Sequence, residues 1–149
     1  MRRAAAGVFS LATLLVGACA VQAAEFRAAV DDAVVLYDGP SAQTKKLFIV
    51  SRGYPLEVIV TVQGWVKVRD ASGAFSWVEA AKVSSKQRTV MVKIPLAQVR
   101  QAADEKSPVV FQAQQNVVME LTEVAGSWLR VRHRDGATGY IRMTQVWGV

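Results

Sequence analysis

Residues 64–73 of this chain read GWVKVRDASG, and residues 127–136, which lie 63 positions further on, read SWLRVRHRDG. The register continues without a gap to residues 83 and 146, and over these twenty aligned pairs six residues are identical and four are close substitutions. Ordinary composition gives about one identity by chance over such a length. The chain therefore contains two copies of one unit of about 60 residues, and this repeat decides the fold.

Hydrophobic alternation inside the first unit predicts β-strands. Residues 56–63 read LEVIVTVQ, a pattern typical of a half-buried strand, whose alternating apolar positions are Leu56, Val58, Val60 and Val62. Residues 65–69 alternate in the same way after a tight turn, and residues 75–78 return after a second turn. In the second unit that turn contains Asp135-Gly136, a strong hairpin signal because glycine adopts positive φ without steric cost.

The rest of each unit predicts little helix. Val83 and Val146 each follow a short segment that is compatible with a single 3₁₀ turn. The one helix candidate is residues 96–105, but the matching part of the first unit contains Gly39-Pro40, which breaks helices, so we interpret residues 96–105 as a loop. Short strands with frequent turns predict an all-β fold of two tandem small β-barrels, with about five short strands each.

The two units are separated by a polar stretch, SSKQR at residues 84–88, which has no apolar periodicity. We therefore place the first domain at residues 26–84 and the second at residues 89–147. A lone unit of this size buries only about 60% of the surface of its unfolded chain and is marginally stable. Packing of the two units against each other would relieve this, so we expect a fixed tandem more than two freely hinged domains.

The repeated motifs resemble those of the bacterial Src-homology-three (SH3) domain family. Its signature is Gly-Trp-x-x-Val, a turn, and then Gly-Trp-Val or Gly-Tyr-Val. The first unit has GWVKV at residues 64–68 and Trp77-Val78 after the turn, and the second has SWLRV at residues 127–131 and GYI at residues 139–141. The resemblance covers about 115 residues and implies two SH3-like barrels.

Two positions depart from the family pattern. Ser76 stands where the family has the glycine before the second aromatic residue. Residues 35–41 (VLYDGPS) resemble the family's opening strand and loop, but residues 99–103 of the second unit have Arg100 and no proline.

The N-terminal residues 1–23 have the pattern of a secretory signal peptide. Arg2 and Arg3 precede an uncharged, mostly apolar run at residues 4–16, and small residues follow. The run is too short to span a bilayer comfortably. Cleavage after residue 23 would place the mature protein in the periplasm. The alternative is an outer-membrane lipoprotein, because VGAC at residues 16–19 resembles a lipobox with Cys19 as the lipidated residue, and only then do we expect a membrane as partner.

The mature chain offers few reactive groups. Loss of residues 1–23 removes the only cysteine. It also removes Arg2 and Arg3, and this lowers the net charge from +6 to +4. This mild charge in an exported protein argues against nucleic acid as a partner. His133 is the only histidine and has no catalytic partner in the sequence. We expect no enzymatic activity, no cofactor and no metal site, which would need several His or Cys ligands.

Two sets of side chains are candidates for ligand binding. The first set is aromatic and has members in both units: Tyr37, Tyr54, Trp65 and Trp77 in the first, and Phe111, Trp128, Tyr140 and Trp147 in the second. The second is basic and shares one strand face with Trp128: Arg130, Arg132 and Arg134. The alternative for each set is structural, since the repeated tryptophans would cover the barrels and the arginines would form a solvated sheet face.

These features predict an exported, non-enzymatic binding module of the cell envelope. In bacterial relatives the resembling family is mostly linked to peptidoglycan and its peptide stems, so peptidoglycan is the first ligand that we expect. Arginine contacts to stem carboxylates or to lipid and lipopolysaccharide phosphates would suit the basic set. The alternative is a periplasmic adaptor or assembly factor that binds a peptide of an envelope protein through an aromatic groove.

Overall fold

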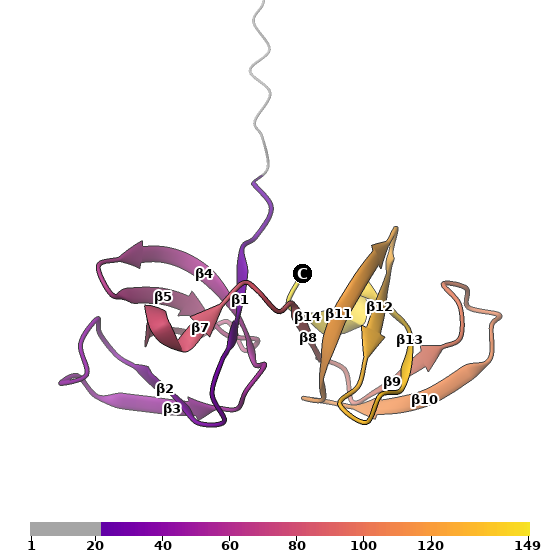
Figure 1. Cartoon of the computed structure of the whole chain (residues 1–149), viewed down its shortest axis with the longest axis horizontal. Coiled ribbons are helices and arrows are strands. Elements are labelled where there is room, and N and C mark those ends of the chain that lie inside the picture. The colour runs from indigo at the N-terminus through magenta and orange to yellow at the C-terminus, as the bar shows by residue number, and fades with distance from the viewer. Residues whose placement is uncertain (1–21) are drawn as a thin grey trace, which may run out of the picture.

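The structure is a computed structural model that describes residues 22–149. Almost all of the predicted signal peptide (residues 1–23), including Cys19, lies outside the described residues. The described part is all-β and forms two barrel-like domains that lie side by side (Figure 1). This confirms the predicted fold class. Within residues 22–149 no helix is long and apolar enough to cross a membrane.

Each domain is one antiparallel sheet of seven strands in the same order. The first sheet runs β3-β2-β6-β5-β4-β1-β7, with strands β1 (Phe26–Ala29), β2 (Val34–Tyr37), β3 (Lys46–Val50), β4 (Pro55–Val62), β5 (Trp65–Arg69), β6 (Phe75–Glu79) and β7 (Val83–Ser84). The second runs β10-β9-β13-β12-β11-β8-β14, with strands β8 (Thr89–Val92), β9 (Leu96–Arg100), β10 (Val109–Gln114), β11 (Val118–Ala125), β12 (Trp128–Arg132), β13 (Thr138–Arg142) and β14 (Val146–Trp147). Seven strands exceed the predicted five or so, because the short strands at the two ends of each unit join the sheet.

The predicted 3₁₀ turns are present in both domains. They are η1 (Ala80–Lys82) and η2 (Met143–Gln145), directly before β7 and β14. The interpretation of residues 96–105 as a loop was wrong in its first half, because β9 occupies Leu96–Arg100. Ala97 and Val99 of β9 are fully buried in the second core, so period-two alternation, and not helical spacing, is the pattern of this segment.

The expected alternation along residues 56–63 holds only for the first half of β4. Leu56 is fully buried, but Val60 and Val62 are 43% and 40% exposed. The pairing of β4 with β5 shifts register between Val58 and Val60, and the pairing of β11 with β12 shifts at the matching residues Leu121 and Glu123. Such a bulge reverses which residues of the strand face inward. Beyond the bulge the β4–β5 hairpin extends past the core, so Val60 and Val62 are exposed.

Each domain has its own hydrophobic core. The first core includes Leu36, Leu56, Val66, Val68 and Val78. The second includes their counterparts along the repeat, Val99, Met119, Leu129, Val131 and Ile141. Since the same positions are buried in both, the repeat in sequence is a repeat of core packing.

The two domains meet at an interdomain joint centred on Trp147. The indole Nε1–H of Trp147 donates a hydrogen bond to the carbonyl oxygen of Pro55 at 2.9 Å, and its ring meets Phe26 edge-on with centroids 5.1 Å apart. The hydroxyl of Thr89, which is itself buried, donates to the carbonyl oxygen of Gly53 at 2.5 Å. Thr89 and Trp147 belong to the second domain, and their partners to the first.

Candidate functional site

The first domain carries an aromatic cluster on the outer face of its sheet. Tyr37 of β2 lies opposite Trp77 of β6, and the Tyr37 ring meets Trp65 of β5 edge-on with centroids 5.4 Å apart. Their strand neighbours Leu36, Val66 and Val78 point inward to the core, so the three aromatic rings lie on the opposite face. Tyr37 is buried by its neighbours, whereas Trp65 and Trp77 remain partly exposed.

A positive charge lies next to these rings. Lys67 of β5 is directly opposite Trp77, and its ammonium group lies 5.4 Å from the ring centroid of Phe75, which is 55% exposed. No ion pair of Lys67 is found within residues 22–149. The first-domain aromatic face, defined as Tyr37, Trp65, Lys67, Phe75 and Trp77, therefore combines open ring surface with an available cation.

Tyr54 is the predicted aromatic residue that the structure places elsewhere. It precedes β4 and packs against the first core, and it makes no ring contact with another aromatic residue of the described chain. Burial raises the pKa of the Tyr54 phenol, and the charge of Asp70 raises this pKa further. Tyr54 therefore lies partly buried at the edge of the first core and is not part of the first-domain aromatic face.

The matching face of the second domain has different chemistry. Trp128 is 6% exposed, and the guanidinium carbon of Arg142 lies 4.3 Å from its ring centroid. Tyr140 on β13 lies between Arg100 of β9 and Arg130 of β12 in the sheet register. The predicted residues Trp128, Tyr140 and Arg130 thus share one region, in which Arg100 replaces the ring of Tyr37, while Trp128 and Tyr140 keep rings at the positions of Trp65 and Trp77.

The predicted basic set is only partly a free positive surface. The Nε–H of Arg132 donates to Glu120 at 2.9 Å, and this ion pair repeats the pair of Arg69 with Glu57 in the first domain. Arg134 is exposed but lies in the turn after β12, not on the strand. Arg130 is exposed on the strand, and no ion pair of its side chain is found within the described residues.

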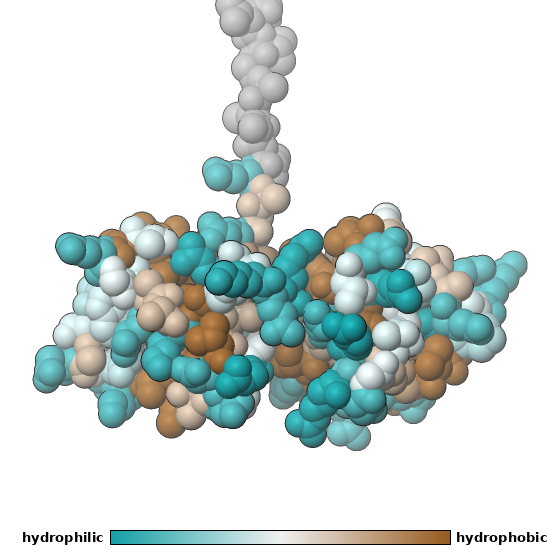
Figure 2. Space-filling view, viewed as in Figure 1, coloured by the Kyte–Doolittle hydropathy of each residue, from teal (hydrophilic) through white to brown (hydrophobic). Residues whose placement is uncertain are grey.

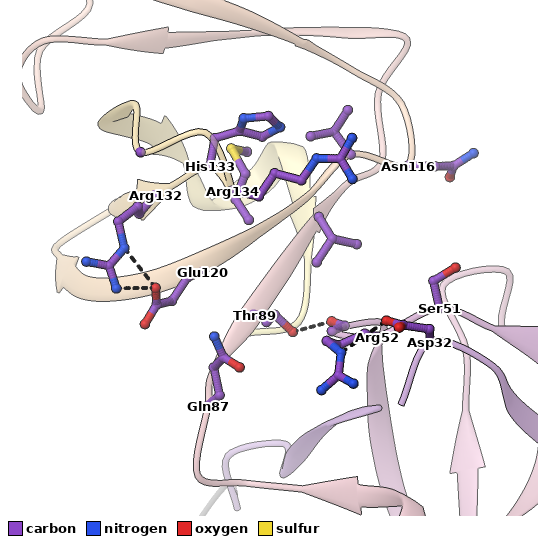
Figure 3. A pocket seen from close by; sticks show the side chains of 15 residues that line it. Asp32, Ser51, Arg52, Gln87, Thr89, Asn116, Glu120, Arg132, His133 and Arg134 are labelled. Carbon is purple, nitrogen blue, oxygen red and sulfur yellow. Dashed lines mark hydrogen bonds and ion pairs between the residues drawn. The ribbon is translucent and has the colours of Figure 1, made fainter. Parts of the chain in front are cut away.

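A groove between the two domains was not foreseen from the sequence (Figure 3). Its volume is about 940 Å³, and its walls include Asp32 and Arg52 of the first domain and Arg132 and Arg134 of the second. Arg52 pairs with Asp32 at 3.1 Å. The space-filling view shows hydrophilic residues on both sides of the domain boundary (Figure 2). No single stretch of sequence predicts this groove, because its residues come from separate parts of the chain.

His133 also lines the groove, and its polar side-chain contacts among the described residues are with Asp135. Its Nδ1 lies 3.0 Å from a carboxylate oxygen of Asp135. The backbone N–H of Ala137 and then the His133 side chain lower the pKa of Asp135. These contacts order the hairpin turn. Within residues 22–149 no group of three or more His, Cys, Asp or Glu side chains is placed to hold a metal ion.

Comparison with protein-family models finds the bacterial SH3 domain twice, at residues 30–85 and 93–148. These matches cover most of the chain, and each contains all the strands of one sheet except the first, since β1 and β8 precede the matched residues. No curated protein matches the chain.

Several solved structures resemble the fold at low identity. NlpC2 from Trichomonas vaginalis matches with 11% identity and a TM-score of 0.38, over 86% of this chain and 49% of that one. NlpC1 from the same organism matches with 14% identity and a TM-score of 0.37, over 94% and 51%. An NlpC/P60 family protein from Bacillus cereus ATCC 10987 matches with 14% identity and a TM-score of 0.39, over 83% and 56%. The chain spans about half the length of these proteins.

Proposed function

The chain belongs to the bacterial SH3 domain family, with two domains in tandem, and from this premise we propose that it is an exported, non-enzymatic module that binds peptidoglycan in the cell envelope. The observation that carries the proposal is the first-domain aromatic face. Ligand sites are lined mainly by apolar and aromatic side chains with a few placed polar groups. Trp65 and Trp77 offer ring surface for sugar rings or stem side chains, and Lys67 offers a positive charge for a stem carboxylate.

The proposal that the module is non-enzymatic rests on its side-chain chemistry. Acid–base or nucleophilic catalysis needs at least two groups placed to act together. The one histidine, His133, contacts Asp135 and the ring of Phe111 at 6.2 Å between centroids. No hydrogen bond joins His133 to a serine, threonine or cysteine side chain among the described residues.

Peptidoglycan binding is tested by co-sedimentation of the mature protein with purified sacculi. We expect the wild type in the pellet, and we expect Trp77→Ala to weaken binding by about tenfold, as loss of a central tryptophan does at other interfaces. The matched control is Tyr140→Ala, which removes the ring at the equivalent position of the second domain and should change binding less than twofold. A wild-type protein that stays in the supernatant contradicts the proposal.

Export and lipidation are tested by the intact mass of protein purified from cells. A chain that starts at Ala24 supports cleavage by the general signal peptidase. A lipid-modified chain that starts at Cys19 supports the lipoprotein alternative. An uncleaved chain that starts at Met1 contradicts export by either route.

An adaptor function is the second candidate, and one observation favours it. Strand β3 lies at the edge of the first sheet, and its residues Phe48 and Ile49 are 54% and 70% exposed. An apolar edge strand is a template for an added peptide strand. Affinity capture from periplasmic extract with the wild type and with Ile49→Lys would test this: a saturable protein partner that the variant loses supports the adaptor, whereas an unchanged set of bound proteins contradicts it.

A further inference from the structure

A second cluster of side chains, on the second domain, surrounds the carboxylate of Glu105. The Nε–H of Arg142 donates to Glu105 at 2.7 Å, and Nε of Arg100 lies 3.8 Å from the other carboxylate oxygen. Glu105 lies in the turn between β9 and β10, and its side chain is 58% exposed. Two guanidinium groups from two adjacent strands of the sheet therefore converge on one carboxylate from a surface turn.

Each arginine is held in place by other groups. The guanidinium of Arg142 stacks on Trp128 at 4.3 Å and donates to the hydroxyl of Ser127 at 3.1 Å. The side chain of Arg100 is only 18% exposed and donates to the carbonyl oxygen of Ser107 and to the amide oxygen of Gln98, both at 2.8 Å. Arginine fixed in this way is preorganised to bind a carboxylate, because little side-chain entropy remains to be lost.

The first domain lacks this cluster at the equivalent positions. Tyr37 stands in place of Arg100, Glu79 in place of Arg142 and Ala42 in place of Glu105, although Trp65 corresponds to Trp128. The scaffold therefore does not need these charged residues in order to fold. Their presence in one copy only suggests a role in binding.

We propose that Arg100, Arg142 and Trp128 form a carboxylate-binding site, and that Glu105 occupies it in the absence of ligand. A pocket of about 190 Å³ lies at this point, with Leu96 and Trp128 among its walls. This volume suits a small carboxylate group with one or two apolar neighbours, such as the carboxyl end of a peptide or an acidic side chain. A ligand must displace Glu105 in order to bind, so occupation of the site by Glu105 lowers the apparent affinity for the ligand. The site is independent of the aromatic face of the proposed function.

The site is tested by NMR titration of the ¹⁵N-labelled mature protein, with the Trp128 indole and Arg142 Nε–H signals as reporters. The probes are acetyl-Ala-Ala, which has a terminal carboxylate, acetyl-Ala-Ala-amide, which has no carboxylate, and acetyl-Glu-amide, which has a side-chain carboxylate. We expect saturable shifts with at least one of the two carboxylate probes and none with acetyl-Ala-Ala-amide. The carboxylate probe that binds more tightly identifies the source of the ligand carboxylate.

The variants separate a binding site from a plain surface ion pair. Glu105→Gln should tighten probe binding about two- to fivefold, since an exposed ion pair of this kind is worth a factor of that size. Arg142→Ala should weaken binding at least tenfold, because charge-assisted hydrogen bonds are lost. Arg142→Glu introduces the residue type of Glu79, which the first domain has at this position and with which that domain folds. This variant should abolish binding.

Lys93→Ala is the matched control. It removes an exposed cation of the second domain that lies outside the pocket and has no ion pair among the described residues, and it should leave the affinity unchanged. The proposal is overturned if neither carboxylate probe shifts the reporters, if the amide probe shifts them equally, or if Glu105→Gln weakens binding. Sacculus binding by the wild type would be unaffected by any of these results, so the two proposals fail separately.

Discussion

At the scale of single residues, the two domains differ most clearly at one small side chain. Gly139 has no room for a larger residue, because a Cβ there would lie 2.6 Å from Cγ1 of Val99 and 2.7 Å from the backbone oxygen of Arg100. The first domain has Ser76 at this position, buried to 4% exposure, and its hydroxyl oxygen has no hydrogen-bond partner among the described residues. The departure from the family pattern therefore leaves a buried polar group unsatisfied.

Ser76→Ala should stabilise the first domain. The substitution removes a hydroxyl that is buried without a partner, and such groups cost about 1–3 kcal/mol. We expect a gain of about 1 kcal/mol in the free energy of unfolding, measured by urea denaturation of the mature protein. A loss of stability would show that the hydroxyl is paired in solution.

Gly139→Ala should have the opposite effect in the second domain. The added Cβ would force Val99 or the backbone of Arg100 to move, and overpacking of this kind costs about 1–3 kcal/mol. The same urea experiment measures it, and an unchanged midpoint would mean that the second sheet is more compliant than its close packing indicates.

The raised pKa of Tyr54 makes the stability of the first domain fall at alkaline pH. Since burial and Asp70 raise its pKa in the folded protein, its stabilising effect is fully present below the ordinary tyrosine pKa and is lost as the pH rises through the raised folded value. Tyr54→Phe should therefore lose less stability than the wild type between about pH 9 and about pH 11. Urea unfolding at both pH values measures the difference, and equal losses in the two proteins would contradict it.

At the scale of strands and hairpins, an ion pair across the central hairpin recurs in both domains. Arg69 Nε donates to Glu57 at 2.6 Å, and the Glu57 side chain is only 14% exposed. In the second domain Glu120 is 30% exposed and its partner Arg132 is 51% exposed. The pairs face each other directly in the sheet register, so each contributes through a cross-strand contact.

The two ion pairs should couple with different strengths. Double-mutant cycles with alanine should give a coupling of about 1 kcal/mol for Glu57 with Arg69 and about half of that for Glu120 with Arg132, because solvent screens the second pair more. Thermal or urea unfolding of the single and double variants supplies the energies. A larger coupling in the second domain would contradict this ranking.

The sequence predicted most elements but not how each one ends. Strands at residues 65–69 and 75–78 followed from alternation, which depends only on which residues are buried. The bulge after Val58 and the strand at Leu96–Arg100 were not predicted, since each depends on how the segment pairs with its neighbouring strand, which the pattern within one segment does not show. For the candidate site, Tyr37, Tyr54, Trp65 and Trp77 of the first unit were predicted as one aromatic set, and the structure brings Tyr37, Trp65 and Trp77 together. Tyr54 lies apart from these three rings, because its sequence neighbourhood does not show which face it joins.

At the scale of the whole molecule, the duplication explains the domains but not the joint between them. Trp147 occupies a position at which the first unit has Ser84, so no repeated pattern marks it. Its contacts with Phe26 and Pro55 cross the domain boundary. The groove between the domains depends on the same joint and was unpredictable for the same reason.

Trp147→Ala should loosen the two domains from each other while leaving both folded. It removes the ring contact with Phe26 and the hydrogen bond to Pro55. ¹⁵N relaxation should show one rotational correlation time for the wild type and shorter, unequal times for the two domains of the variant. Trp77→Ala, which removes a tryptophan far from the joint in the sheet, should keep the single correlation time. A Trp147→Ala variant that still tumbles as one body would show that the remaining contacts hold the joint.

The position of Trp147 also turns the joint into a natural optical reporter. The chain has four tryptophans, and the other three, Trp65, Trp77 and Trp128, lie on strands within single domains. If those three are replaced by phenylalanine, the emission spectrum comes from the boundary alone. A shift of this emission to longer wavelength, without loss of the circular-dichroism signal of the β-sheets, would then report separation of the two domains. Any ligand that separates the domains or holds them together would become detectable by fluorescence without an attached dye.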